Sequence, residues 1–278
     1  MGYTSEQRRI AVVLDTVDEA ITETNALIMK LKQVRAGLLH GLLTCGLDEH
    51  DQLRDPIAHS EQFQDSHLGR IPKGWEVMRL GSCAQFVTSG SRGWASYYSD
   101  EGALFLRIGN LTREHIDLRL EDLVRVRPPA GSEGARIRVQ PGDILISITA
   151  DLGIIGVIPE PFEDAYVNQH IALVRPVPAV CSRWIGRYLS FGSTAKFFRM
   201  LNDAGAKAGM NLPSIESLLL AIPSREEQDR TTAILDSMDA DIAEQRRLAT
   251  KLQYLKSALM ADLLTGRVRV PEGIAVAP

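Results

Sequence analysis

The sequence predicts an α+β protein in which one strand-rich domain is flanked by two long helices of the coiled-coil type. Two observations support this fold class. A long stretch near the N-terminus recurs near the C-terminus in the same register, and the segment between the copies changes to short apolar runs separated by Gly and Pro. A repeat of this kind constrains the whole fold, because each copy forms the same structural unit.

The repeat aligns residue 6 with residue 227 and continues without a gap. Both copies begin with Glu-Gln-x-Arg, at Glu6 and Glu227, and both end in Leu-Leu-Thr, at Thr44 and Thr265. Two related stretches that bracket an insert are natural partners for each other. Identical residues in the two copies include Glu6, Gln7, Arg9, Leu14, Asp15, Asp18, Ile21, Lys30, Leu31, Leu38 and Leu42 of the first.

Each copy is predicted to form one long helix, over residues 1–46 and 224–267. Apolar side chains recur at alternating steps of three and four, which is the a/d seam of a coiled coil, and no proline interrupts either copy. About 38 residues at roughly 1.5 Å each give a rod of about 57 Å, which needs a partner helix to bury its seam. The simplest interpretation is a stalk or dimerisation element, whose partner is the other copy or a second chain. The predicted seam residues are Ile10, Leu14, Val17, Ile21, Ile28, Leu31, Val34, Leu38, Leu42, Leu235, Met238, Ile242, Leu252, Leu255, Leu259 and Leu263.

Charge and cysteine content limit the class of protein. The formal net charge of −4 argues against a surface that binds nucleic acid everywhere, but residues 71–213 are slightly basic, with 16 Lys and Arg against 14 Asp and Glu. Most of these cations are Arg, which suits phosphate and guanine but is also common on ordinary surfaces. The three cysteines have no metal-ligand spacing, and neither a membrane span nor a signal peptide is evident. We expect a soluble, cytoplasmic protein with reduced thiols.

Composition divides the rest of the chain into a linker at residues 47–70, a strand-rich domain at 71–223 and a tail at 268–278. Gly46 is the expected C-cap of the first helix and Ser224 the expected N-cap of the second. Within the domain, residues 182–202 have a helical period. The predicted strands are residues 75–80, 104–108, 144–148, 154–158 and 166–174.

The sequence lacks the motifs of common catalytic centres. It has no phosphate-binding loop, no Asn-Pro-Pro-aromatic tetrapeptide, no G-x-S-x-G elbow and no H-x-x-x-H pair. His170 lies on a predicted strand, where an imidazole is more often structural than catalytic, and Asp143 follows Pro141-Gly142 as a turn residue does. We expect no catalytic residue, no metal site and no cofactor.

Four stretches of the insert combine with the flanking repeat into a specific pattern. They are Ile71-Pro72-Lys73-Gly74-Trp75-Glu76-Val77, Leu106-Arg107-Ile108-Gly109-Asn110-Leu111, Gly142-Asp143-Ile144-Leu145-Ile146-Ser147 and Asn168-Gln169-His170-Ile171-Ala172. An apolar run then ends at Ile222-Pro223, just before Glu227-Gln228. Together with the repeat, this order resembles the specificity subunit of Type I restriction–modification systems, and the insert resembles that family's target-recognition domain.

The resemblance implies a non-catalytic subunit that reads one half of a bipartite site in double-stranded DNA. It implies that the helices dock methyltransferase subunits, which in turn bind the motor-nuclease subunit. A full-length family member runs recognition domain, helix, recognition domain, helix, whereas this sequence starts at the first helix and resembles a form with a single recognition domain. Either one chain reads one half-site, or two chains form a homodimer through the helices and read a symmetric site; we favour the homodimer.

The candidate DNA contacts are Arg92, Arg107, Asn110, Asn168, Gln169 and Lys207. The three amides can bond adenine edges, although an Asn near a turn more often caps its own backbone. Arg92 and Lys207 lie among small residues that permit close approach, whereas Arg107, like Arg113, Arg136 and Arg138, either reaches DNA or lies on a solvated face.

Two other functions remain open from the sequence. The chain is either a reader of DNA or a remnant that only binds the methyltransferase subunit as an interaction scaffold. A nuclease centre of its own would require a metal-dependent motif, and no Glu-x-Lys follows a suitably placed Asp. Base readout depends on loop geometry, so the target sequence cannot be derived from the residues.

Overall fold

A computed structural model describes residues 2–128, 131–203 and 209–273 of the chain. It divides the chain into two compact units, one made of residues 1–39 and 234–278 and the other of residues 40–233. We call the first the helix pair and the second the strand-rich domain. The predicted α+β class is confirmed. Within the described ranges, no helix is long and apolar enough to cross a membrane.

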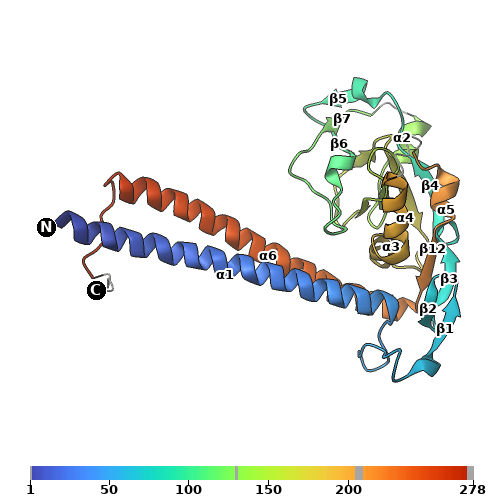
Figure 1. Ribbon diagram of the computed structural model, residues 1–278. Coiled ribbons are helices and arrows are strands. Elements are labelled where there is room, and N and C mark those ends of the chain that lie inside the picture. The colour runs from blue at the N-terminus through green and yellow to red at the C-terminus, as the bar shows by residue number, and fades with distance from the viewer. Residues whose placement is uncertain (1, 129–130, 204–208, 274–278) are drawn as a thin grey trace. The chain divides into compact units, whose positions relative to one another are not determined.

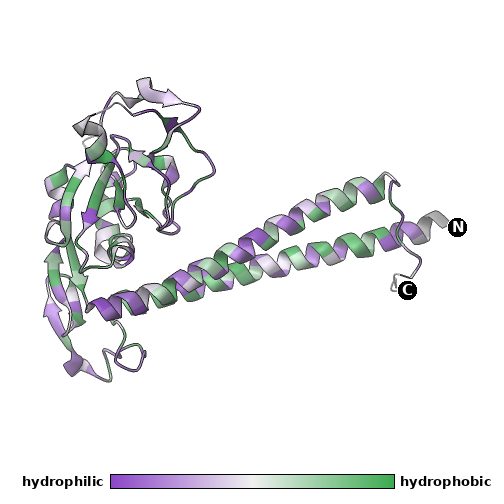
Figure 2. Cartoon of the chain, turned by 180° about the vertical axis from the view of Figure 1, so that it is seen from behind, coloured by the Kyte–Doolittle hydropathy of each residue, from purple (hydrophilic) through white to green (hydrophobic). Residues whose placement is uncertain are grey.

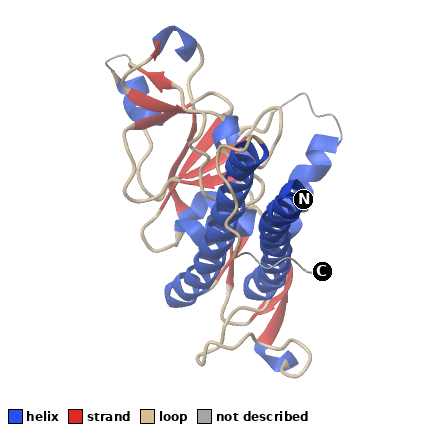
Figure 3. Ribbon diagram, turned by 90° about the vertical axis from the view of Figure 1, so that its left-hand side faces the viewer, coloured by secondary structure: helices blue, strands red, loops and turns tan. Residues whose placement is uncertain are grey.

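The helix pair is formed by α1 (Gly2–Thr44) and α6 (Arg225–Leu264), which lie side by side (Figures 1 and 3). Two ion pairs join them. Lys256 Nζ lies 2.6 Å from Asp18 Oδ1, and Arg35 donates from Nε and Nη2 to the two carboxylate oxygens of Asp239. Asp18 precedes Arg35 on one helix while their partners follow the reverse order on the other, so the helices are antiparallel.

The two ion pairs are equivalent under the sequence repeat. The offset that aligns residue 6 with residue 227 also aligns Asp18 with Asp239 and Arg35 with Lys256. Exchanging the two helices therefore maps each ion pair onto the other, which is approximate two-fold symmetry of the isologous kind. The two copies of the repeat are partners within one chain.

The predicted seam is buried along only part of the helix pair. Ile28, Ile242 and Leu263 are buried, but Val34 and Leu255 are 46% and 47% exposed, so their assignment to the seam is wrong. A strict heptad drifts around a straight helix because 3.6 does not divide seven, and side chains leave the contact as it drifts. Apolar residues do recur along both helices in Figure 2.

Exposed apolar residues on the helix pair also follow the repeat. Leu27, one heptad before Val34, is 43% exposed, and its equivalent Leu248, one heptad before Leu255, is 41% exposed. We call Leu27 with Val34, and Leu248 with Leu255, the outer apolar pairs. Each helix thus presents one such pair to solvent.

The strand-rich domain contains short strands and four shorter α-helices among its described residues. The strands are β1 (Phe63–Ser66), β2 (Gly69–Pro72), β3 (Glu76–Arg79), β4 (Ala84–Ser89), β5 (Tyr98–Ser99), β6 (Ala103–Leu106), β7 (Arg125–Val126), β8 (Ile144–Ser147), β9 (Ile155–Val157), β10 (Ala165–Val167), β11 (Ile171–Pro176) and β12 (Leu219–Ile222). The helices are α2 (Ser132–Ile137), α3 (Ser182–Leu189), α4 (Gly192–Asp203) and α5 (Leu212–Glu216).

The core of this domain lies between two four-stranded sheets. One has the order β10-β6-β7-β5, with β10 parallel to β6, and the other is antiparallel with the order β4-β11-β8-β9. Leu104, Leu106 and Val167 from the first sheet pack in one cluster with Leu145 and Leu173 from the second. Strands β6, β8, β9 and β10 are buried at every position, which explains why their sequences are apolar runs rather than alternating patterns.

Two smaller pairings hold the ends of the domain. Strands β1 and β2 form an antiparallel hairpin in and just beyond the segment expected to be a linker. Strand β3 pairs with β12 in antiparallel register, from Glu76 opposite Ile222 to Arg79 opposite Leu219. The chain therefore enters and leaves the domain on neighbouring strands. The helical period at residues 182–202 corresponds to two helices, α3 and α4, rather than one.

The carboxylate of Glu227 holds together the place where the chain enters and leaves the domain. Its Oε1 accepts hydrogen bonds from Leu47 N at 2.9 Å, Arg54 Nη1 at 2.6 Å and Trp75 Nε1 at 3.3 Å, and its Oε2 accepts from Arg54 Nη2 at 3.2 Å. The side chain is only 7% exposed. Gly46 is left-handed, with φ of 66°, and a Cβ there would lie 2.1 Å from Glu227 Oε1, so a glycine is required on both counts.

Neighbouring residues complete this junction. Ser224 Oγ accepts from Glu227 N at 3.2 Å, which confirms the predicted N-cap, and Gly46 confirms the predicted C-cap. Gln228 donates to Pro223 O at 2.9 Å and accepts from Cys181 N at 2.7 Å. The Glu-Gln dipeptide that opens the second copy of the repeat therefore binds three segments that are distant in sequence.

Replacing Glu227 with Ala is expected to destabilise the strand-rich domain by roughly 2–4 kcal/mol, because it leaves the Arg54 guanidinium, the Trp75 indole N–H and the Leu47 amide without their acceptor. Urea unfolding followed by tryptophan fluorescence measures this change. Asp229→Ala is the matched control, since that carboxylate is 52% exposed and its ion-pair partner Arg225 is also exposed; we expect a change below about 0.5 kcal/mol. Equal stability of the two variants would contradict the assigned role of Glu227.

Candidate functional site

Polar loops gather at one edge of the sheet β4-β11-β8-β9. Strands β4 and β8 end there, and β11 and β9 begin there, because Ser89 lies opposite Ala172, Ser147 opposite Ile171, and Ile146 opposite Ile155. We call the four segments 89–93, 148–151, 168–170 and 209–211 the loop edge. Met210 N joins the last segment to Ile148 O at 2.9 Å.

A close backbone contact at Gly90 fixes the first segment against the third. A Cβ on Gly90 would lie 2.0 Å from Asn168 O and 2.3 Å from Val167 O, so only glycine permits this approach. Ser91 and Asn168 form a parallel β-bridge, and Gly90 N donates to Ile171 O at 3.2 Å. The small residues of this loop therefore serve packing within the chain.

The prediction of one continuous strand over residues 166–174 is wrong. Strand β10 pairs with β6 in one sheet, and β11 pairs with β4 and β8 in the other. Between them, Asn168 Oδ1 accepts from His170 N at 3.1 Å, and Asn168 O accepts from Ile171 N at 3.1 Å. An Asn side chain that bonds the backbone two residues on forms an Asx turn, which ends one strand and starts the next.

A hydrogen-bonded chain orients the amide of Gln169. His170 Nδ1 lies 2.6 Å from Thr149 Oγ1, and His170 Nε2 lies 3.1 Å from Gln169 Nε2. All three side chains belong to the loop edge. A side chain held by partners of this kind keeps one orientation and offers its remaining amide groups at a fixed place.

With His170 neutral, the loop edge carries one cation, Arg92, and one anion, Asp151. Asp151 is the one carboxylate in its four segments, and Arg113 neutralises it while Asn202 Nδ2 donates to it at 3.2 Å. Arg92 is exposed, and no described residue accepts a hydrogen bond from its side chain or pairs with its charge. The loop edge can thus offer amide, hydroxyl and guanidinium groups to an anionic ligand.

The other predicted contact residues have different positions. Arg107 follows β6, whose Leu106 O accepts from Asn168 N at 3.0 Å, and its guanidinium lies 3.7 Å from the exposed Asp122. Asn110 is 2% exposed; its Oδ1 accepts from Arg107 N, and its Nδ2 donates to the carbonyls of Arg119 and Asp122. These bonds give Asn110 the role of a backbone cap. Lys207 lies outside the described residues.

Two members of the loop edge, Thr149 and His170, were not predicted as site residues. They are 21 positions apart, and neither carries a motif of its own. Only the pairing of β8 with β11 places them together, so no local sequence pattern reveals them. Burial raises the pKa of the nearby Tyr166, and Asp164 raises it further, so this phenol remains neutral.

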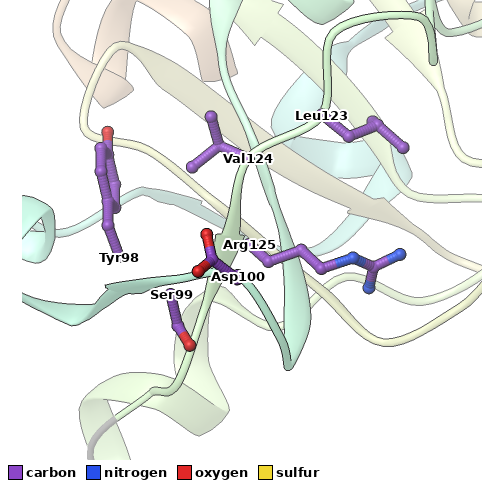
Figure 4. A pocket seen from close by; sticks show the side chains of 6 residues that line it. All are labelled: Tyr98, Ser99, Asp100, Leu123, Val124 and Arg125. Carbon is purple, nitrogen blue, oxygen red and sulfur yellow. The ribbon is translucent and has the colours of Figure 1, made fainter.

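A separate hollow of about 530 Å³ lies beside β5 and β7 (Figure 4). The guanidinium of Arg125 extends away from Tyr98 in that view and is bound to Glu163 at 2.9 Å and to Gly102 O at 2.7 Å. Its charge is therefore compensated. In the part of the chain that the structure describes, no group of three His, Cys, Asp or Glu side chains is placed to hold a metal ion.

Gly90→Ala is expected to destabilise the strand-rich domain by roughly 1–3 kcal/mol, because the added methyl group meets backbone atoms that cannot turn aside. Chemical unfolding measures the change. Gly109→Ala is the control, since no atom lies within 4 Å of its added Cβ. If both variants unfold at the same urea concentration as the unmodified protein, the close approach of residues 90 and 168 does not exist in solution.

The sequence of this chain is similar to those of known proteins over most of its length. Residues 72–252 match the family described as Type I restriction modification DNA specificity domain. The chain is 26% identical over 272 residues to the putative type I restriction enzyme MjaX specificity subunit of Methanocaldococcus jannaschii, covering 95% of this chain and 58% of that one. It is 24% identical over 280 residues to the Type I restriction enzyme EcoBI specificity subunit of Escherichia coli, covering 95% and 57%. The chain spans less than two thirds of the length of these relatives.

Solved structures share the fold. The HsdS subunit from Thermoanaerobacter tengcongensis has a TM-score of 0.51 at 21% identity, with 95% of this chain and 59% of that chain covered. The Type-I restriction-modification system S subunit from M. genitalium has a TM-score of 0.60 at 16% identity, with 93% and 60% covered. Because the family match extends over more than half of the sequence, the chain belongs to the family of Type I restriction–modification specificity subunits.

Proposed function

We propose that this chain is the DNA sequence-recognition subunit of a Type I restriction–modification complex, that it reads a half-site with the loop edge, and that it docks methyltransferase subunits through the helix pair. One observation carries the proposal. The loop edge combines oriented amides with a cation, Arg92, that the described residues leave uncompensated. Amides read base edges in the major groove, and arginines bind phosphates or guanine.

The proposed roles differ among the predicted contact residues. Gln169 reads a base, and adenine is the base whose N6 and N7 match an amide. The Oδ1 of Asn168 accepts a hydrogen bond within the turn, so its Nδ2 is the group that donates to the DNA. Arg92 binds the DNA backbone or a guanine, and Arg107 adds a second DNA contact from the adjoining loop. Lys207 remains a proposed phosphate contact. Asn110 is not proposed as a contact, because its side chain is buried and its oxygen and nitrogen both bond to the backbone of this chain.

In this proposal the chain performs no catalysis and holds no cofactor. Methylation belongs to the methyltransferase subunits, and cleavage belongs to the motor-nuclease subunit that binds through them. The setting is the cytoplasm, where double-stranded DNA and these partners are present.

The outer apolar pairs are the proposed methyltransferase docking surface. Exposed apolar side chains at heptad spacing suit a partner helix, because a helix laid along them buries both members of a pair. The pairs are equivalent under the repeat, so the same kind of partner surface fits both. Two copies of one methyltransferase subunit therefore match the approximate symmetry of the helix pair.

The proposed reader is a homodimer, in which two chains supply two recognition domains to a symmetric site. Light scattering of the purified chain and of its complex distinguishes this arrangement from a single chain that reads one half-site. A single copy of this chain in both samples would contradict the homodimer and leave half-site reading intact.

Co-purification with a cognate methyltransferase subunit, followed by sequencing of methylated DNA, tests the proposal. A bipartite methylated motif is the expected result, and a symmetric one further supports the homodimer. A stable complex that methylates no defined motif would favour the alternative, an interaction scaffold that no longer reads DNA.

Gln169→Ala is expected to make the methylated motif degenerate at one base position, with a loss of discrimination of about 1–3 kcal/mol there. Sequencing of DNA methylated by the variant complex measures this. Gln85→Ala is the matched control, because Gln85 lies at the start of β4, whereas the loop edge lies at the end of that strand. An unchanged motif for Gln169→Ala would remove Gln169 from the base-reading residues.

The double variant Leu27→Glu with Leu248→Glu is expected to reduce methyltransferase binding about tenfold or more. Burial of an exposed leucine side chain against the partner would stabilise the complex by up to roughly 1.5–3 kcal/mol, and the glutamate loses this contribution. Both side chains are exposed, so the helix pair should remain folded by circular dichroism. The double variant Gln33→Glu with Gln253→Glu adds the same charge at exposed positions and serves as the control. Equal binding by the two double variants would show that docking does not use the outer apolar pairs.

A further inference from the structure

Most arginines in the middle of the strand-rich domain are neutralised by carboxylates. Their ion-pair partners lie on neighbouring loops and strands, at distances of up to 3.7 Å. Such arginines offer a ligand less charge than an unpaired arginine does, because a partner already compensates part of it. The neutralised residues are Arg107, Arg113, Arg125, Arg127, Arg138, Arg175 and Arg183.

Arg136 differs because neutral oxygens hold its guanidinium. Its Nη1 donates to Thr88 Oγ1 and, at 3.0 Å, to Ser89 O, and its Nη2 donates to Ser91 Oγ at 3.2 Å. No carboxylate of a described residue pairs with it, although the residue is exposed. The positive charge is therefore fixed in place, and no carboxylate among the described side chains compensates it.

The free donors of Arg136 fit a phosphate group. A guanidinium has five N–H groups, and the three acceptors above occupy three of them. The remaining two are the Nε–H and one N–H of Nη2, which can share one edge of the planar fork. Two parallel N–H groups on one edge match two oxygens of a phosphate.

Its anchors place Arg136 directly beside the loop edge. Ser89 and Ser91 are members of the first segment, and Ser91 forms the β-bridge to Asn168. Thr88 and Ser91 are 5% and 6% exposed, so the anchoring hydroxyls are part of the packed domain rather than a mobile surface. The guanidinium is thus held by the segment that the Ser91 bridge joins to Asn168, the residue before Gln169.

We propose that Arg136 is a phosphate anchor, which binds one backbone phosphate of the DNA and thereby sets the register of the loop edge against the bases. This inference rests on the proposed function and assigns Arg136 a positioning role, whereas Gln169 reads a base. A phosphate contact carries no sequence information of its own, so its loss weakens binding to all sequences alike.

The experiment measures DNA affinity of the chain in complex with its methyltransferase subunit, on one duplex with the methylated motif and one with a single base changed. Salt is varied between about 0.05 and 0.3 M. Arg136→Gln is expected to lower the affinity for both duplexes about tenfold at about 0.1 M salt and to reduce the slope of log K against log salt by about one. Arg136→Lys keeps the charge and should keep the slope. Arg138→Gln, two residues away and paired with Asp164, is the control that should keep both slope and affinity.

A second measurement compares each complex with itself, so a general loss of affinity in a variant does not affect the result. Duplexes with a single neutral methylphosphonate linkage are scanned along the site. At one linkage the unmodified complex and Arg138→Gln should lose about tenfold in affinity, whereas Arg136→Gln should lose nothing further there.

The outcomes separate this inference from the function on which it rests. If the unmodified complex discriminates the duplexes but Arg136→Gln retains its salt slope, the anchor is overturned and DNA recognition stands. If Arg136→Gln changes the ratio between the duplexes, Arg136 reads a base, and the phosphate assignment is wrong. If the unmodified complex does not discriminate the duplexes, the proposed function and this inference both fail.

Discussion

A single buried carboxylate organises the strand-rich domain at its entrance. Glu227 accepts hydrogen bonds from a backbone amide, a guanidinium and an indole, and these donors belong to residues that precede it by more than 150 positions. A carboxylate 7% exposed is tolerable only because its lone pairs are occupied by such donors. Strands β3 and β12 also pair where the chain enters and leaves the domain. The Arg54–Glu227 ion pair and this strand pair therefore hold the two ends of the domain together.

In each long helix, a Glu near the N-terminal end accepts a hydrogen bond from an Arg that follows the other long helix. In the helix pair, Glu6 accepts from Arg269 Nη1 at 3.1 Å, and Arg269 follows α6. In the strand-rich domain, Glu227 accepts from Arg54, which follows α1. The same logic applies to the Asp18 and Asp239 ion pairs, so the repeat specifies contacts as well as helices. Equivalent contacts on antiparallel helices also generate equivalent surfaces, which is why exposed leucines occur in matched positions.

The loop edge is built by the devices that build the fold. An Asx turn at Asn168 ends one strand and starts another in a different sheet, and the glycine approach at Gly90 holds the neighbouring loop against it. Side chains in such a turn are fixed by main-chain geometry and cost little ordering entropy when a ligand binds. Amides and arginines held in this way suit the reading of a rigid duplex, in which donors must meet base edges and phosphates at set positions.

The sequence by itself determined the fold class, the two long helices with their caps at Gly46 and Ser224, most of the buried strands, and the family resemblance that residues 72–252 bear out. These features are local or periodic, so neighbouring residues carry them. Tertiary structure decided the rest. It split residues 166–174 between two sheets, placed Val34 and Leu255 outside the helix seam, made Asn110 a buried cap, and separated Arg136 from the arginines that carboxylates neutralise. Each of these depends on partners far apart in the chain, and no local pattern records which donor meets which acceptor.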